Sequence, residues 1–229
     1  MKSLLYCVYG KIWSNVLLLN KVVIYSPGQV KEQMKLGTHV SIRSGLVLSR
    51  KHAKEMPVCS YPLLTLRSMQ PDGRIDLSKI ESFDSTELLQ SEYLSQVGDI
   101  IVRLTEPYTA ALIDQDTADM VVTSNFLIIR TNPNWFLPEY LFWFLNSKEI
   151  RQKVAKNSSS NVLRAVNASY FSALECPLLP ISSQKKLAEL HLLAQKEQQL
   201  LIKLAVEKEK LYDRLLAQAF EQEKEVALR

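Results

Sequence analysis

The last 48 residues of the chain contain the longest uninterrupted periodic pattern in the sequence. Residues 182–229 include neither proline nor glycine, the two residues that most disfavour the interior of a helix. Apolar side chains recur at spacings of four and three, which is typical of a helix that packs along one seam. At about 1.5 Å per residue, a helix of just over 40 of these residues is roughly 60 Å long. A single globular unit of this size cannot cover it.

The seam of this predicted helix is mostly leucine. Its apolar positions are Leu190, Ala194, Leu201, Leu204, Leu211 and Leu215, and its polar ones are Glu197, Lys208 and Gln218. Nine basic and eight acidic residues from position 183 onward balance the other sides. The rest of the chain offers no second helix of comparable length. We therefore expect Leu190, Leu201, Leu204, Leu211 and Leu215 to pair with a helix of another molecule.

The region before this helix reads as a globular unit of strands and turns. Alternating or β-branched runs at residues 34–49, 61–69, 97–104 and 120–130 predict strands, with a strand or a hairpin around Gly45. From Pro138 the period changes to that of a helix running to about residue 157, and a proline suits a first helical turn. A polar tract, NSSSN, follows at residues 157–161. The predicted fold class is α+β, with a twisted sheet preceding one long helix.

Three units follow along the chain. Residues 1–33 lack a clear period and close on Ser26-Pro27-Gly28, so we interpret them either as an appendage or as a translated stretch upstream of Met34. Residues 34–181 form the globular unit. Residues 182–229 form the long helix.

Signatures of catalysis are missing from the sequence. The cysteines at 7, 59 and 176 and the histidines at 39, 52 and 191 are scattered, so we predict no metal site, no cofactor and a reducing, cytoplasmic location. No apolar run reaches the ~18 residues that span a bilayer. The tetrapeptide Asn132-Pro133-Asn134-Trp135 is similar to the base-holding box of adenine methyltransferases, but it lacks the second proline and a glycine-rich partner loop. We interpret it as a turn.

Charge is unevenly distributed along the chain, whose net charge is +4. Residues 34–67 contain six basic residues and one acidic residue, and residues 140–170 contain five and one. Residues 72–99 between them contain seven acidic and two basic residues. Such segregation is expected of an electropositive face built from two segments, although chance can also produce it.

Five segments resemble, in order, the DNA-specificity (S) subunits of type I restriction-modification systems. They are MKLGTHVSIRSG, YPLLTLRSMQPDGRI, VGDIIV, TSNFLIIRTNPNWFLPEYLFWFLNSKEIRQKV and CPLLPISSQKKLAEL, the last including Gln184. No segment is specific alone, but their order over residues ~34–222 is much stronger evidence than any one of them. The chain departs from the family in carrying one recognition unit and one long helix, where members usually carry two of each. Residues 103–109 and 157–166 also lack the glycine common there.

The resemblance implies a non-catalytic subunit that binds double-stranded DNA. Two recognition units would lie at opposite ends of an antiparallel helix pair and read a bipartite, inverted-repeat site as a homodimer. The resemblance also implies two protein partners, a methyltransferase (modification) subunit and a restriction (nuclease-translocase) subunit. It implies no association with a membrane. The DNA-contacting candidates are Arg43, Arg50, Lys51, Arg67, Arg103, Thr105, Tyr108, Lys156, Asn157, Ser159, Asn161 and Arg164.

Two alternatives remain open at this point. The chain could be a coiled-coil interaction protein whose globular unit binds another protein and has no role with DNA. The aromatic residues from 136 to 144 could form a stacking platform for single strands or a contact with the methyltransferase subunit. Their helical spacing favours core packing instead.

Overall fold

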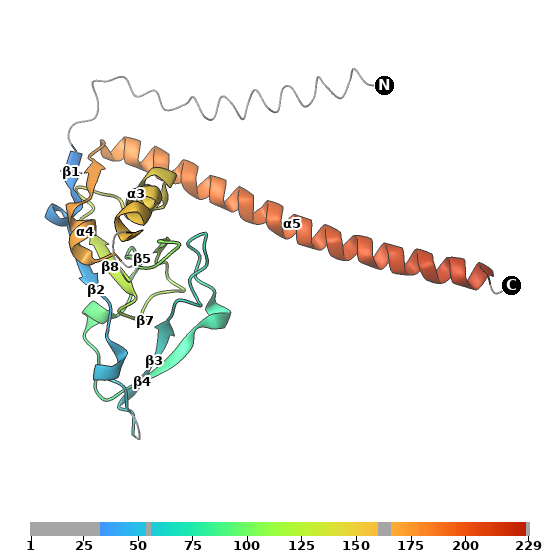
Figure 1. Ribbon diagram of the computed structural model, residues 1–229, viewed down its shortest axis with the longest axis horizontal. Helices are drawn as coiled ribbons and strands as arrows, with labels where there is room; N and C mark the ends of the chain where they lie inside the picture. The colour runs from blue at the N-terminus through green and yellow to red at the C-terminus, as the bar shows by residue number, and fades with distance from the viewer. Residues whose placement is uncertain (1–32, 54–55, 160–165, 228–229) are drawn as a thin grey trace, which may run out of the picture.

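The computed structural model describes residues 33–53, 56–159 and 166–227, which form a head and a projecting helix (Figure 1). The proposed appendage at residues 1–33 therefore lies outside the described residues, except for Gln33. No helix in the described ranges combines the length and apolar character needed to cross a membrane.

The centre of the head is a four-stranded antiparallel sheet in the order β2-β8-β5-β6. Its strands are β2 (Val40–Ser44), β8 (Phe126–Thr131), β5 (Ile100–Arg103) and β6 (Ala110–Leu112). Ile100 and Val102 point into one apolar cluster, and Ile101 points into another on the opposite face. Both faces are covered, which explains why these strands read as continuous apolar runs.

Two smaller sheets flank the central one. The first has the order β4-β3-β7, with β4 (Glu81–Ser85), β3 (Cys59–Leu64) and β7 (Val121–Val122). The second pairs β1 (Gln33–Lys35) with β9 (Glu175–Pro177). Short 3-10 turns connect the strands, namely η1 (Leu36–Thr38), η2 (Leu48–Arg50), η3 (Leu77–Lys79) and η4 (Ser91–Tyr93).

The segment around Gly45 forms a strand, β2, and not a hairpin, so the first of the two expected alternatives is correct. The partner of β2 is β8, more than 80 positions later in the chain. A Cβ atom at Gly45 would lie 2.4 Å from the carbonyl oxygen of Val122. Only glycine allows this close approach of two backbone segments.

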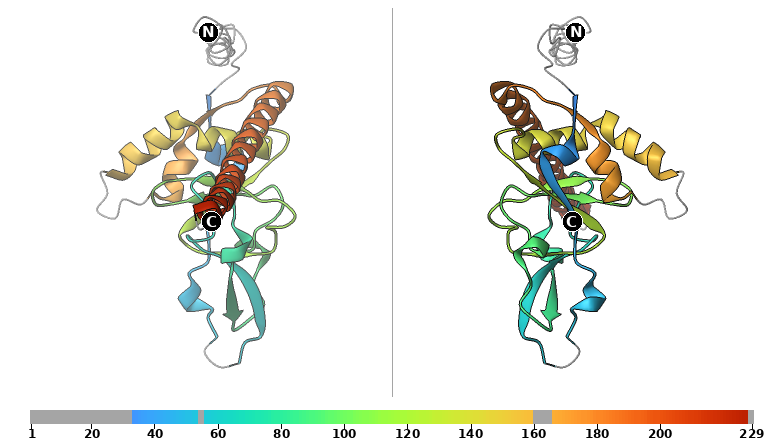
Figure 2. Two further views of the ribbon diagram at one scale, coloured as in Figure 1. Left: turned by 90° about the vertical axis from the view of Figure 1, so that its right-hand side faces the viewer. Right: turned by 90° about the vertical axis from the view of Figure 1, so that its left-hand side faces the viewer.

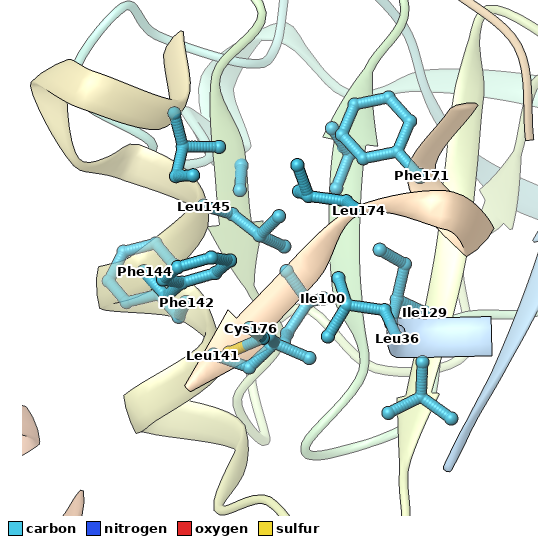
Figure 3. Close-up of a cluster of buried hydrophobic side chains, with 14 of the residues drawn as sticks. Leu36, Ile100, Ile129, Leu141, Phe142, Phe144, Leu145, Phe171, Leu174 and Cys176 are labelled. Atoms are coloured by element: carbon cyan, nitrogen blue, oxygen red, sulfur yellow. The ribbon is translucent and has the colours of Figure 1, made fainter. Parts of the chain in front are cut away.

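Three helices cover one face of the central sheet: α2 (Pro138–Asn146), α3 (Lys148–Ser159) and α4 (Ala168–Ala173). The core lies between them and the sheet, where Leu141 and Leu145 meet Ile100 and Ile129 (Figure 3). Phe136, Tyr140, Phe142 and Phe144 are buried there, and Trp143 is half-buried. The aromatic segment is therefore core, which leaves no stacking platform.

The predicted helix from residue 138 to 157 is interrupted, which corrects the expectation of one helix. Ser147 has an extended backbone, with ψ at 144°, and it separates α2 from α3. The amide of Asn146 donates to the carbonyl of Ala110 at 3.0 Å, and its oxygen accepts from the nitrogen of Ala110 at 3.1 Å. These bonds tie the end of α2 to strand β6 and turn the chain there.

The long helix α5 (Ile181–Ala227) has 47 residues and leaves the head after its first few turns (Figure 1). The ring of His191 lies 5.4 Å from that of Phe142 in α2, and the amide of Gln195 donates to the carbonyl of Asp72 at 3.3 Å. From position 200 to 224 every side chain is exposed. The α+β class and the terminal helix are confirmed.

Gln184 joins α5 to the head. Its side chain is 0% exposed. Its oxygen accepts from the nitrogen of Leu137 at 2.9 Å, and its amide donates to the carbonyls of Trp135 and Leu179 at 2.8 and 2.9 Å. Three backbone groups from the starts of α2 and α5 are thus satisfied by one side chain.

Candidate nucleic-acid interface

The loop after β5 meets two other segments at one end of the central sheet. The last residue of β5, Arg103, is paired with Phe126, the first residue of β8. The nitrogen of Leu104 then donates to the carbonyl of Asn125 at 3.0 Å, and the nitrogen of Val166 donates to the carbonyl of Leu104 at 3.1 Å. The loop at residues 104–109, the turn before β8 and the chain just after the polar tract therefore lie side by side.

The same loop is bonded to helix α3 on its other side. The hydroxyl of Tyr108 donates to the hydroxyl oxygen of Ser158 at 2.5 Å. The guanidinium of Arg151 donates to the carbonyl of Pro107 at 3.1 Å and to the hydroxyl of Thr109 at 3.0 Å. Ser158 and Val166 flank the polar tract on its two sides. The fold thus brings together two of the candidate segments that lie about 50 residues apart in sequence.

Arg103 is a half-buried cation at this end of the sheet. Its guanidinium donates to the hydroxyl of Thr105 at 3.2 Å and to the carbonyl of Leu66 at 3.5 Å. The second bond connects it to the turn that carries the exposed Arg67. Neither arginine forms a salt bridge within the described ranges. Their positive charge is therefore available to a phosphate.

Arg43 and Lys51 are placed differently, because each faces a carboxylate. Arg43 pairs with Glu92, and Lys51 pairs with Glu87. The carbonyl of Lys51 also accepts from the nitrogen of Thr86 at 2.9 Å, directly after β4. The acidic segment that is separate in sequence thus folds beside the basic segment and offsets part of its charge.

The candidates consequently fall into two groups. Arg50 is exposed in η2 next to Lys51, at the end of the head formed by β3 and β4. Both views of Figure 2 show that end well away from the yellow helix α3. Lys156 and Asn157 are exposed near the end of α3, beside the loop of Arg103. Arg67, Arg103, Thr105, Lys156 and Asn157 lie around the loop at residues 104–109, which connects the end of β5 to α3, and are hereafter called the α3-side rim.

One candidate does not lie on the surface. Tyr108 is only 6% exposed and belongs to the core cluster under α2 and α3. Its backbone φ of 54° turns the chain so that the side chain points inward. Expecting it on the exposed rim was therefore wrong. Thr105 is half-buried. Ser159 ends α3, and Asn161 and Arg164 lie outside the described residues.

Two polar residues beside this rim were not among the candidates. Ser124 and Asn125 are exposed in the turn before β8, and Asn125 accepts from Leu104. A signal for them exists in the sequence, since a Ser-Asn turn stands directly before a buried strand. Recognising it requires knowing that this strand pairs with β5.

A metal or thiol site has no support within the described ranges. No group of three potential ligands from His, Cys, Asp and Glu is found there. Burial raises the pKa of the Cys176 thiol to about 12, which keeps it protonated and unreactive near neutral pH. Asp99 is buried against Arg130, with Nε 2.9 Å from its carboxylate. Burial raises the pKa of Asp99 despite this contact.

Comparisons with known proteins bear on the fold. No family model and no curated protein matches the sequence. Among solved structures, the HsdS subunit from Thermoanaerobacter tengcongensis aligns with a TM-score of 0.56 and 18% identity, over 82% of this chain and 48% of that one. A chain from a structure of the type I R-M system aligns at 0.49 with 17% identity, over 73% and 45%. The type I restriction-modification S subunit from M. genitalium aligns at 0.48 with 13% identity, over 73% and 40%.

The first of these alignments covers 82% of the chain, which is more than the head alone. The resemblance indicated by the five sequence segments is thereby confirmed for the fold. The chain has the fold of the HsdS subunit and spans about half the length of that protein.

Proposed function

We propose that the chain is the DNA-recognition subunit of a type I restriction-modification system, with residues 34–181 as the target-recognition domain and residues 182–229 as the spacer and dimerisation helix. The observation that carries the proposal is that one loop, residues 104–109, connects Arg103 and the turn of Arg67 to the end of α3 in a head with the HsdS fold. Arg67 and Arg103, which form no salt bridge among the described residues, supply phosphate affinity, and neighbouring amides and hydroxyls supply contacts to bases.

The subunit itself carries no catalysis in this proposal. A methyltransferase subunit modifies the DNA, and a restriction subunit joins it in the complete cytoplasmic complex. Since one head reads one part of a site, two copies pair through α5 and read a bipartite target. Two-fold symmetry makes that target an inverted repeat.

A second function has one observation in its favour. Met56, Val58 and Leu88 are 90%, 62% and 72% exposed at the end of the head formed by β3 and β4. Exposed apolar side chains that gather in one place are typical of protein contacts. A coiled-coil interaction protein with a protein-binding head would use this end and leave the α3-side rim unused.

Duplex binding at several salt concentrations separates the two functions. Phosphate neutralisation makes the logarithm of affinity fall linearly with the logarithm of salt concentration. We expect this slope for the purified dimer, alone or with a methyltransferase subunit, on duplexes from the host genome. If neither preparation binds DNA, or if both bind it with an affinity that does not depend on salt, the DNA-recognition proposal is rejected and the protein-binding head is favoured.

A further inference from the structure

The leucine seam of α5 faces away from the head. At about 100° per residue, two sets of residues in the first turns point in directions roughly 120° apart. The set that packs on the head is Gln184, Ala188, His191 and Gln195, and the seam set is Leu190, Ala194, Glu197 and Leu201. A second helix can therefore lie along the seam without displacing the head.

The leucines of this seam are uncovered. Leu190, Leu201, Leu204, Leu211 and Leu215 are 50–58% exposed. A row of leucines over more than three turns is an apolar surface that helices bury by pairing. Two charged residues, Glu197 and Lys208, interrupt the row and belong to the same seam. Neither forms a salt bridge or a side-chain hydrogen bond within the described part of the chain.

The seam becomes self-complementary when a second copy of α5 lies antiparallel to it. If the two-fold axis passes between Ile202 and Lys203, Leu201 of each copy faces Leu204 of the other. Moving outward along the same seam, Glu197 faces Lys208, Ala194 faces Leu211, and Leu190 faces Leu215. From Leu190 to Leu215 every seam position thus meets an apolar partner or the opposite charge, and symmetry forms the ion pair twice.

Other alignments lose this match. Sliding one helix by a heptad in either direction places Glu197 and Lys208 opposite leucines. A parallel pair in register places Glu197 against Glu197 and Lys208 against Lys208. Charges left without a partner in a helix interface, or facing a like charge, weaken that arrangement selectively. Glu197 and Lys208 interrupt the apolar seam of a single helix. In a pair of helices they therefore specify the orientation and the register.

We propose that α5 binds α5 of a second copy of this chain in this antiparallel register, with reciprocal Glu197–Lys208 ion pairs fixing it. The inference rests on the homodimer of the proposed function and adds the geometry. The two Gln184 joints are then separated by 37 residue rises, about 55 Å. Because α5 is a continuous helix, this register sets the distance between the two heads.

The test is a charge-exchange cycle on the full-length chain, with dimer affinity measured by sedimentation equilibrium. E197K places two lysine–lysine contacts in each dimer, and K208E places two glutamate–glutamate contacts. At about tenfold per contact, each single variant dimerises about 100-fold more weakly than the original chain. The double variant E197K/K208E restores both opposite-charge contacts and returns to within about threefold of the original affinity.

Matched controls reverse charges outside the seam. E209K and K203E change residues on exposed sides of the same helix, and we expect less than about threefold change in dimer affinity from either. Circular dichroism confirms that all variants keep the helix. A mixture of E197K and K208E chains forms a heterodimer more tightly than either chain pairs with itself, because both contacts are then between opposite charges.

The outcomes separate the register from the dimer. If E197K and K208E leave the dimer affinity unchanged, the proposed register is wrong and the homodimer is retained. A parallel pair would give this result, because like charges already face each other in it. Single variants that weaken the dimer without rescue in E197K/K208E also overturn it. A chain that stays monomeric at all concentrations overturns both the register and the homodimer.

Discussion

Replacing Gln184 with methionine tests the joint between the head and α5. Methionine keeps an unbranched side chain of similar volume, so the change removes the polar groups and leaves the packing nearly intact. Three hydrogen bonds of 2.8–2.9 Å are lost, and three backbone groups of Leu137, Trp135 and Leu179 lose their partner. At about 1 kcal/mol for each bond, the free energy of unfolding falls by about 3 kcal/mol.

Urea unfolding measures this loss. The concentration of protein is held constant, because pairing makes the apparent stability of a dimer depend on it. Lys185→Met is the matched control, since Lys185 is the exposed neighbour of Gln184 on α5, and we expect it to change stability by less than about 0.5 kcal/mol. Hydrogen exchange at the amide of Leu137 adds a local readout and accelerates in Gln184→Met.

The expected loss of stability assumes that the three hydrogen bonds of Gln184 hold α5 to the head. A fall of less than about 1 kcal/mol in Gln184→Met, with unchanged exchange at Leu137, would show that other contacts hold α5 to the head.

Three further predictions concern the rim, the helix and pH. Arg103→Glu weakens duplex binding by about 1–3 kcal/mol in filter-binding or anisotropy assays and leaves the dimer intact, and Arg164→Glu does the same. Lys185→Glu changes neither property, and unchanged DNA affinity in both Arg103→Glu and Arg164→Glu would reject the choice of face. Leu204→Glu and Leu211→Glu each abolish pairing of α5, so light scattering that still shows a dimer would contradict the seam. Burial holds the pKa of His191 below its usual 6.5, so its contribution to stability is complete above that pH and is lost as pH falls through the lower folded pKa. Thermal unfolding between pH 7 and pH 5 should therefore show a smaller decrease in His191→Leu than in the original chain, and equal decreases would argue against a buried neutral imidazole.

Local periodicity accounts for the elements that the sequence predicts well. The β-branched runs became β5 and β8, and the leucine repeat without proline or glycine became α5. Pro138 does begin a helix. These features depend on neighbouring residues within one element, so a single sequence contains the information needed to recognise them.

Contacts between distant segments account for what the sequence could not predict. The break at Ser147 follows from bonds between Asn146 and a strand 36 positions earlier. Tyr108 can be buried because its hydroxyl donates a hydrogen bond to the hydroxyl of Ser158, 50 positions later. Neither partner is visible in a local pattern, because strand pairing and side-chain hydrogen bonds are chosen among many distant alternatives.

By itself, the sequence determined that an α+β head is followed by a long amphipathic helix, because hydrophobic period and helix propensity are local properties. The tertiary structure alone decided which charges remain available on the head. It placed Glu92 and Glu87 beside Arg43 and Lys51, left Arg103 without a carboxylate among the described residues, and turned the free side of α5 outward. The electrostatics of a surface depend on distances through space, and folding sets those distances between residues that are far apart in the chain.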